Sequence, residues 1–237
     1  MARIARVVVP ELPHHITQRG NFGQDTFFTD EDRTCYLSWL KAYAQRYGLR
    51  IWAWCLMTNH VHFVAVPEAK GSMAKTFNQT HMRHAQRINS RFKINGHLWQ
   101  ARFYSCVLDE PHLYRAVRYV ENNPVRAGLV RQAQDYLWSS ARAHVEGRQD
   151  RIVAIEEPLS GMIGDWHSYL QAGIAEDSDW VRELRNCTRS GLPVGSKDFV
   201  SGLERQLGRV LRSAGRGRPR KMKKRRAGRR TKLAPSA

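Results

Sequence analysis

The feature of the sequence that most restricts its fold is a pair of apolar runs separated by only four residues. Ile51 to Leu56 and Val61 to Val66 are each long enough to form a strand, and Met57-Thr58-Asn59 lies between them. A connection this short joins antiparallel neighbours, because parallel strands need a crossover of roughly a dozen residues or more. The two runs therefore predict a β-hairpin.

Further strands and helices are predicted on both sides of the hairpin. Residue patterns predict strands at 14–19 and 99–108, and helices at 30–47, 73–95 and 110–123. Thr29, Ser72 and Asp109 are suitable N-caps for these helices, and Pro124 ends the third. Strands and helices thus alternate around one hairpin. This favours an α+β fold with an antiparallel or mixed sheet and helices mainly on one of its faces.

Composition excludes several classes of protein. Hydrophobic residues make up 42% of the 237 residues, which is enough for a packed core and excludes a wholly disordered chain. The four cysteines form no CxxC pair, so reduced thiols are expected rather than disulfides or a cysteine-based zinc site. No signal peptide is recognisable, and polar residues interrupt the apolar stretch 51–67, so no membrane segment is predicted. We expect a cytoplasmic protein.

The charge of the chain is strongly positive and unevenly distributed. The formal net charge is +18, and residues 216–232 contribute eleven Lys and Arg without an acidic residue, which leaves +7 for the remainder. Clustered cations bind polyanions by releasing the counterions of phosphates, so a nucleic-acid partner and a nucleoid-associated location are predicted. Arg216, Arg218 and Arg220 resemble the core of an AT-hook. A solubility tail or non-specific phosphate binding would explain the same residues.

A pair of histidines marks the second strand of the hairpin. His60 and His62 alternate with Val61 and Phe63. Alternate residues of a strand point to the same face, so the two imidazoles are expected on one face, about 7 Å apart along the backbone. Imidazole nitrogen is a good ligand for Mn, Zn, Fe or Ni and is tolerable for partly hydrated Mg. The alternative is that both histidines are partly buried and satisfied by hydrogen bonds.

A tyrosine and an asparagine lie four residues apart in the third predicted helix. Tyr119 and Asn123 therefore share one helix face, beside the apolar stripe rather than in it, and Tyr119 is expected to be exposed and able to move. The amide of Asn123 can supply a third metal ligand or orient the tyrosine. The alternative is a boundary aromatic residue followed by an ordinary helix-terminal residue.

Five segments of the sequence resemble one family of enzymes. They are LPHHITQRGN (12–21), WCLMTNHVHFVAVP (54–67), GHLWQARFYS (96–105), LYRAVRYVENNPVRAGLV (113–130) and YLWSSARAH (136–144). Their order resembles that of the single-tyrosine, IS200-like transposases of the His-hydrophobic-His superfamily. The branch most resembled is the REP-associated tyrosine transposases, which accompany repetitive extragenic palindromes (REP). The resemblance covers about residues 3–145, and 191–209 also resembles that branch.

The resemblance implies a ferredoxin-like antiparallel sheet with helices packed on it and a nuclease site on the sheet. It places His60 and His62 as metal ligands, Tyr119 as the nucleophile, and Asn123 where the family has a polar third ligand, commonly the longer Gln. The implied activity is DNA transposition. A Mg- or Mn-dependent endonuclease and strand transferase would nick and rejoin single-stranded DNA at REP-type hairpins through a 5′-phosphotyrosine.

DNA contacts are expected where basic and aromatic residues interleave, because bases stack on aromatic faces and cations follow phosphates. The expected contact residues are Arg19, Asn21, Arg83, Arg87, Arg102, Arg118, Arg216, Arg218 and Arg220. For the helix residues among them a solvated face is the alternative. Arg115 or Arg118 would also help the tyrosine to ionise. The partner is single-stranded or hairpin DNA, bound by a monomer or a homodimer.

Three parts of the chain are distinguished. Residues 1–145 form the transposase-like domain, 146–213 a helical C-terminal extension, and 214–237 a basic tail that is expected to be disordered. Within the extension, apolar residues spaced four apart predict an amphipathic helix: Phe199, Leu203, Leu207 and Leu211.

Two other functions are compatible with the same residues. One is a catalytically silent protein that binds nucleic acid on the same fold. The other is a metal hydrolase that combines the histidine pair with further histidines such as His81 and His84 and forms no covalent intermediate. Tyr114 is a competing nucleophile, although its neighbour one turn later is Arg118, which cannot bind a metal.

Overall fold

The computed structural model describes residues 6–154, 159–172 and 178–211. Four strands form one antiparallel sheet in the spatial order β2-β3-β1-β4: β1 (His14–Arg19), β2 (Leu49–Leu56), β3 (His60–Pro67) and β4 (Tyr104–Val107). Helix α1 (Asp30–Tyr47) connects β1 to β2, and α2 (Ser72–Phe92) connects β3 to β4. This connectivity and strand order are those of a ferredoxin-like α+β fold, as predicted.

Three of the six predicted helix ends are confirmed, at Asp30, Tyr47 and Glu110. Helix α2 ends at Phe92 instead of 95, and α3 (Glu110–Glu121) ends at Glu121 instead of 123. Pro124 therefore does not end α3, because it lies in the next helix, α4 (Asn123–Arg126).

Thr29 caps α1, and Gly48 ends it in the left-handed conformation with φ 62°. Asp109 caps α3. Ser72, in contrast, is the first residue of α2 and not its cap.

The strand predicted at 99–108 is shorter in the structure, because only Tyr104–Val107 forms β4. The preceding residues 96–103 form a loop beside the end of β1. Two backbone hydrogen bonds hold the loop there: Asn21 N to Leu98 O at 2.8 Å, and Gln100 N to Arg19 O at 2.9 Å. The loop therefore lies next to the end of the strand that pairs with the histidine strand β3.

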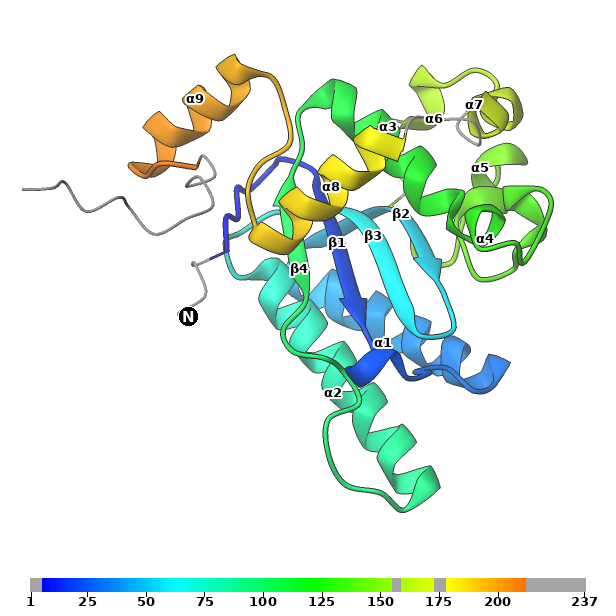
Figure 1. Ribbon diagram of the computed structural model, residues 1–237. Coiled ribbons are helices and arrows are strands. Elements are labelled where there is room, and N and C mark those ends of the chain that lie inside the picture. The colour runs from blue at the N-terminus through cyan, green and yellow to red at the C-terminus, as the bar shows by residue number, and fades with distance from the viewer. Residues whose placement is uncertain (1–5, 155–158, 173–177, 212–237) are drawn as a thin grey trace, which may run out of the picture.

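Helices cover both faces of the sheet (Figure 1). Helices α1 and α2 pack on the face that contains Val61 and Phe63, whereas α3 and α8 (Ser178–Ser190) pack on the face that contains Val64. The expectation of helices mainly on one face is therefore wrong. The physical reason is that β2 and β3 are apolar on both faces, so that both faces must be covered.

The other helices of the described chain follow the sheet in sequence. They are α4 (Asn123–Arg126), α5 (Ala141–Val145), α6 (Leu159–Met162), α7 (Trp166–Ala172) and α9 (Lys197–Leu207). The predicted amphipathic helix is confirmed in part: Leu203 is buried and Phe199 and Leu207 are partly buried in one cluster with Val7 and Val9, which Leu211 joins from beyond the helix. The helix itself ends at Leu207, before Gly208.

The predicted basic tail, 214–237, lies outside the described residues together with Arg216, Arg218 and Arg220. Its expected disorder and the domain boundary at 145 stay predictions. Among the residues that the structure describes, no helix combines the length and apolar character that crossing a bilayer requires.

Candidate active site

The candidate site lies on the face of the sheet that α3 and α8 cover. His62 of β3 is paired with Thr17 of β1, and His60 with Arg19. The two imidazole rings are nearly perpendicular, and their centroids are 5.0 Å apart. Val61, between them in the sequence, is completely buried on the opposite face. The two imidazoles thus share one face, as the alternation along a strand predicts.

Tyr119 of α3 lies against this histidine pair. The centroid of its ring is 5.4 Å from that of His62, and the two rings are perpendicular. Only 4% of the tyrosine is exposed, so the expectation that it is exposed is wrong, whereas its ability to move stays a prediction. The ring belongs to a buried cluster with Val181 and Leu184 of α8. Burial therefore comes from a helix whose position the sequence did not reveal.

Arg185 of α8 contacts the phenol of Tyr119. Its Nε donates a hydrogen bond of 3.1 Å to the phenol oxygen, and its guanidinium carbon is 5.8 Å from the ring centroid. The arginine is exposed. A positive charge at the surface is thereby connected directly to the buried tyrosine.

Three residues that the sequence associated with the phenol or its reaction have other neighbours. Arg115 lies 4.3 Å above the ring of Trp180, Arg118 lies 4.9 Å above the ring of Tyr169, and the hydroxyl of Tyr114 donates to the sulfur of Met162 at 2.8 Å. Instead of Arg115 or Arg118, it is Arg185 that forms a hydrogen bond with the phenol oxygen, and Arg126 lies 5.7 Å from the centroid of the same ring.

Asn123 is buried at the junction of α3 and α4, with 7% of the residue exposed. Its Nδ2 donates to Tyr119 O at 2.8 Å and to Val120 O at 3.3 Å. These bonds satisfy carbonyl groups at the end of α3. The amide therefore stabilises the backbone that carries the tyrosine, and its function as a metal ligand stays a prediction.

The two histidines of β3 fit one half of a divalent-metal site. Their Nδ1 atoms are each hydrogen-bonded, that of His60 to Asn59 Oδ1 at 2.6 Å and that of His62 to His15 Nε2 at 3.0 Å. No described residue forms a hydrogen bond with Nε2 of either ring. Ligating histidines commonly bind a metal through one nitrogen while the other is held by a neighbour. Within the described ranges, no group of three or more His, Cys, Asp or Glu side chains is arranged so that it could hold a metal ion.

Both imidazoles are held in the neutral form that binds metals. Burial, together with the positive charges of Arg19 and Arg185, lowers the pKa of His60 to about 4. Burial and the neighbouring His60, His15 and Arg185 lower the pKa of His62 well below its usual value. Both rings are therefore uncharged at neutral pH.

A third histidine, which the sequence interpretation missed, completes the cluster. His15 of β1 stacks on His62 with ring centroids 5.2 Å apart, and its Nδ1 is 2.8 Å from Thr188 Oγ1 of α8. Its ring is 5.8 Å from that of Tyr119. The signal was present, because positions 15, 17 and 19 of a strand share a face. It required knowing that β1 and β3 are neighbours.

Comparison with known proteins assigns the segment that contains these residues to a family. The family model described as "Transposase IS200 like" (Y1 transposases) matches residues 12–123. Residues 12–123 belong to the IS200-like transposases. These are tyrosine nucleases that typically use a divalent metal. The match includes the histidine pair and Tyr119 and ends before α8.

Two solved structures are similar to the chain. A REP-associated tyrosine transposase bound to a REP hairpin is 19% identical and has a TM-score of 0.54, covering 65% of this chain and 92% of that one. A candidate transposase from Deinococcus radiodurans is 20% identical with a TM-score of 0.35, covering 51% and 97%. The first likeness supports the fold. A search of curated proteins found no match.

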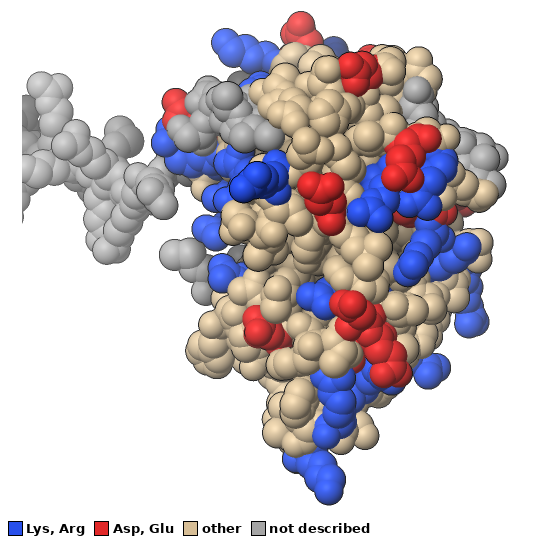
Figure 2. Space-filling view, turned by 90° about the vertical axis from the view of Figure 1, so that its right-hand side faces the viewer, with Lys and Arg blue, Asp and Glu red and all other residues tan. Residues whose placement is uncertain are grey.

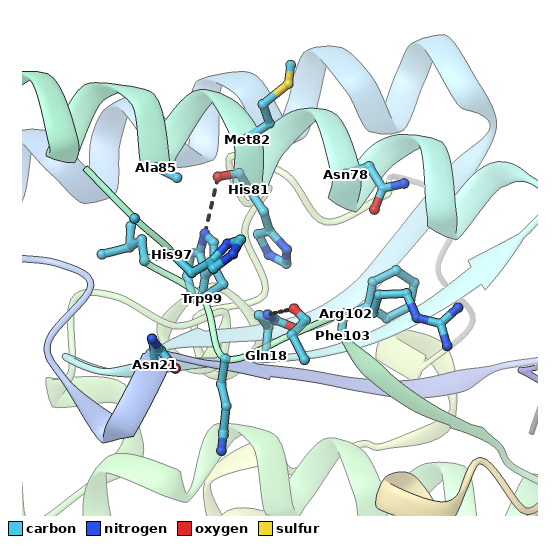
Figure 3. A pocket seen from close by; sticks show the side chains of 14 residues that line it. Gln18, Asn21, Asn78, His81, Met82, Ala85, His97, Trp99, Arg102 and Phe103 are labelled. Atoms are coloured by element: carbon cyan, nitrogen blue, oxygen red, sulfur yellow. Dashed lines mark hydrogen bonds between the residues drawn. The ribbon is translucent and has the colours of Figure 1, made fainter. Parts of the chain in front are cut away.

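A cavity of about 590 Å³ lies between α2 and the loop 96–103 of the IS200-like segment (Figure 3). Asn21 and Arg102, two of the predicted DNA contacts, line it together with Gln18 and Phe103. Gln18 precedes Arg19 on β1, so their side chains point to opposite faces of the sheet. The cavity and the histidine cluster are therefore on opposite faces and meet at the end of β1.

On the side of the molecule shown in Figure 2, charge alone does not single out a DNA-binding surface. Basic and acidic side chains are interspersed there (Figure 2). Arg87 of α2 is paired with Glu31 of α1 at 2.8 Å, so part of its charge is already compensated. Arg83 on the same helix is exposed, as are Arg19 and Arg102.

The histidines of the alternative metal hydrolase do not join the site. Both histidines belong to α2. His81 Nε2 is 3.0 Å from the hydroxyl of Tyr36 in α1, and His84 Nε2 is 2.7 Å from Thr26 O. They lie on the other face of the sheet from His60 and His62. The specific ligand set expected for that alternative is therefore wrong.

Proposed function

We propose that this chain nicks and rejoins single-stranded DNA at palindromic, REP-type hairpins through a covalent 5′-phosphotyrosine. The observation that carries the proposal is the contact between the rings of Tyr119 and His62, 5.4 Å apart, within a segment that belongs to the IS200-like transposases. A phenol beside a neutral imidazole pair combines a nucleophile with metal-binding groups. The sheet and α3 bring these groups together.

In the proposed reaction the phenol oxygen of Tyr119 attacks a backbone phosphorus. The phenol loses its proton, a bond from oxygen to phosphorus forms, and the bond from phosphorus to the 3′ oxygen breaks. The 3′ oxygen takes up a proton and leaves as a free 3′-hydroxyl. Because the phosphoester bond energy is retained, a 3′-hydroxyl of another strand can reverse the step and rejoin the DNA.

The residues around the tyrosine have separate functions in this proposal. Arg185 stabilises negative charge on the phenol oxygen through its hydrogen bond of 3.1 Å. His60 and His62, with Asn123 as the predicted third ligand, would hold Mg or Mn. When bound, such a metal neutralises a non-bridging oxygen of the phosphate. The buried position of Asn123, whose Nδ2 is bonded to α3, makes the two histidines the principal ligands.

Unpaired nucleotides beside the hairpin are the proposed occupants of the cavity at the end of β1. Arg102 and Asn21 supply a cation and an amide, and Phe103 lines the same cavity. Arg19, exposed and paired with His60, lies on the side of the nuclease site. A DNA strand bound in the cavity is thus close to Arg19, which lies beside His60. The REP hairpin bound by the structural relative is consistent with this substrate class.

A nicking assay with a 3′-labelled hairpin oligonucleotide and Mn²⁺ tests the proposal. The downstream fragment is expected to remain attached to the protein and to migrate as a labelled adduct under denaturing conditions. Tyr119→Phe should abolish the adduct and the nick, whereas the control Tyr114→Phe should retain both. Cleavage by Tyr119→Phe would overturn the covalent mechanism. Hairpin binding by the native chain without any nick would leave the catalytically silent binder as the function.

A further inference from the structure

We infer that helix α8 is part of the active centre, and that Thr188 and His15 are positioning residues that fix the tautomer of His62. The inference rests on the proposed function, in which His62 binds a metal. Helix α8 lies beyond residue 123, where the family match ends. A chain of hydrogen bonds leads from α8 through His15 of β1 to His62 of β3.

The first step is the hydroxyl of Thr188. Its Oγ1 donates to Leu184 O at 2.7 Å, the carbonyl one turn earlier in α8. A hydroxyl has one proton and a carbonyl has none, so this bond uses the proton of Thr188. The oxygen can then only accept, from His15 Nδ1 at 2.8 Å and from the thiol of Cys106 at 3.2 Å. The ring of His15 therefore carries a proton on Nδ1.

The second step is the ring of His15. It is 1% exposed, and its hydrogen-bond partners, Thr188 and His62, carry no negative charge. A buried imidazole without a carboxylate partner is neutral and has one proton. Because that proton is on Nδ1, Nε2 of His15 is an acceptor. It accepts the Nδ1 proton of His62 at 3.0 Å.

The third step is the consequence for His62. With its proton on Nδ1, the Nε2 atom has a free lone pair, which is the form that binds a divalent metal. His60 reaches the same state through Asn59 Oδ1, its neighbour in the sequence. The two ligands therefore differ in their support. His60 is held locally, whereas His62 is held from α8.

Helix α8 also reaches the nucleophile. Arg185 precedes Thr188 by three positions, so both side chains lie on one face of the helix. Arg185 Nε bonds the phenol of Tyr119 at 3.1 Å, while Thr188 begins the chain of bonds to His62. One helix face thus orients the nucleophile and one of the two histidine ligands.

The test measures Mn²⁺ binding and the tautomer of His62 in the full chain without DNA. Thr188→Val keeps the shape of the side chain and removes the acceptor, and His15→Phe removes both ring nitrogens. We expect each variant to bind Mn²⁺ about 10- to 100-fold more weakly by electron paramagnetic resonance. Nitrogen-detected NMR of the imidazoles should show His62 protonated at Nδ1 in the native chain and a mixture of tautomers in Thr188→Val.

A matched control exists in α2. Thr80 is completely buried and donates to Thr76 O at 2.8 Å, the same bond within a helix that Thr188 makes. Thr80→Val should leave Mn²⁺ affinity unchanged. Thr188→Ser, which keeps the hydroxyl that Thr188→Val removes, should bind Mn²⁺ with the affinity of the native chain. The double variant Thr188→Val/His15→Phe should lose no more affinity than His15→Phe alone, because both changes break one chain of bonds.

The outcomes separate this inference from the proposed function. If His60→Ala weakens Mn²⁺ binding but Thr188→Val and His15→Phe do not, only the inference is overturned. Additive losses in the double variant would also overturn it. If His60→Ala leaves Mn²⁺ affinity unchanged, the metal site of the proposed function is wrong, and the inference fails with it. Should Thr188→Val not fold, His15→Phe and its tautomer spectrum decide the question.

Discussion

The hydroxyl of Tyr119 is the atom on which the proposed reaction depends, and Arg185 contributes the hydrogen bond that reaches it. A donor aimed at an oxygen that becomes negative acts most strongly where water is excluded, and Tyr119 is buried. At this scale the site consists of a phenol, a guanidinium and a chain of neutral imidazoles. Each of these groups has a named partner, so each can be tested by a single substitution.

Arg185→Ala is expected to slow formation of the covalent adduct by about 100-fold, because the phenolate loses its hydrogen-bond donor and the nearby charge. The measurement is the single-turnover rate at saturating hairpin and Mn²⁺. The control is Arg182→Ala on the same helix, where an exposed arginine pairs with Asp179 at 2.8 Å. A rate for Arg185→Ala within threefold of that control would show that the contact has no catalytic effect.

Glu121, two residues after the tyrosine, stabilises α3 and its surroundings. Its completely buried carboxylate accepts hydrogen bonds from Ser140 at 2.5 Å and from His144 Nδ1 at 2.6 Å. Glu121→Ala is expected to lower the free energy of unfolding by about 3–5 kcal/mol, because the partners lose a buried acceptor. Urea unfolding measures the change, and the exposed Glu146 provides the control substitution to Ala. A loss below about 1 kcal/mol would contradict the expectation.

At the scale of elements, local sequence signals predicted the sheet and its first helices. The cap at Thr29, the end at Gly48 and the alternation around His60 each depend on neighbouring residues, and the structure agrees with them. The position of α8 depends instead on contacts with β4 and α3, far away in the sequence. No local pattern contains that information. The sequence therefore predicted correctly that His60 and His62 share one face of a strand, but it predicted wrongly that Tyr119 is exposed to solvent.

The pairing of α1 with α2 shows how an element-level contact acts on a titratable group. Asp32 of α1 is completely buried and accepts two hydrogen bonds from Arg91 of α2, at 2.8 and 2.9 Å, and others from the backbone of Phe28 and Thr29. Burial alone would raise the pKa of Asp32, but Arg91 and the backbone donors outweigh it and keep the pKa below its usual 3.8.

Asp32→Asn is expected to cost about 1.5–3 kcal/mol of stability at pH 7, because charge-assisted hydrogen bonds to the carboxylate are lost. The lowered pKa means that this stabilisation is complete above pH 3.8 and disappears as the pH falls through the folded-state value. Urea unfolding should therefore give the same cost at pH 7 and at pH 5. The control Glu31→Gln, at a largely exposed ion pair, should cost less than about 1 kcal/mol. Equal costs for both substitutions would contradict this account.

At the scale of the whole molecule, buried histidines make the fold sensitive to acid. His14, His81 and His84 are buried and do not belong to the His60 and His62 pair. Burial is the main reason that the pKa lies at about 4 for His14, about 3 for His81 and about 4 for His84, against a usual 6.5. These rings stay neutral in the folded chain while the unfolded chain takes up protons.

Stability is therefore expected to be constant above about pH 7 and to fall as the pH drops below 6.5, by up to about 1.4 kcal/mol per pH unit for each histidine. The decline should end near pH 4, where the folded chain also takes up protons. Urea unfolding between pH 7.5 and about pH 5 measures it. Substitution of the exposed His97 by Gln should not change the slope. A free energy of unfolding that does not vary over this range would contradict the expectation.

Because α8 follows the sheet and α3 in the chain, it is synthesised after them. Translation at about 5–20 residues per second completes the sheet and Tyr119 several seconds before Arg185 and Thr188 emerge. A nascent or prematurely terminated polypeptide would thus possess the whole family segment with an unsupported His62 and an uncovered phenol. On the inference drawn for α8, full DNA-cutting competence arrives late in translation, which limits nicking by incomplete products.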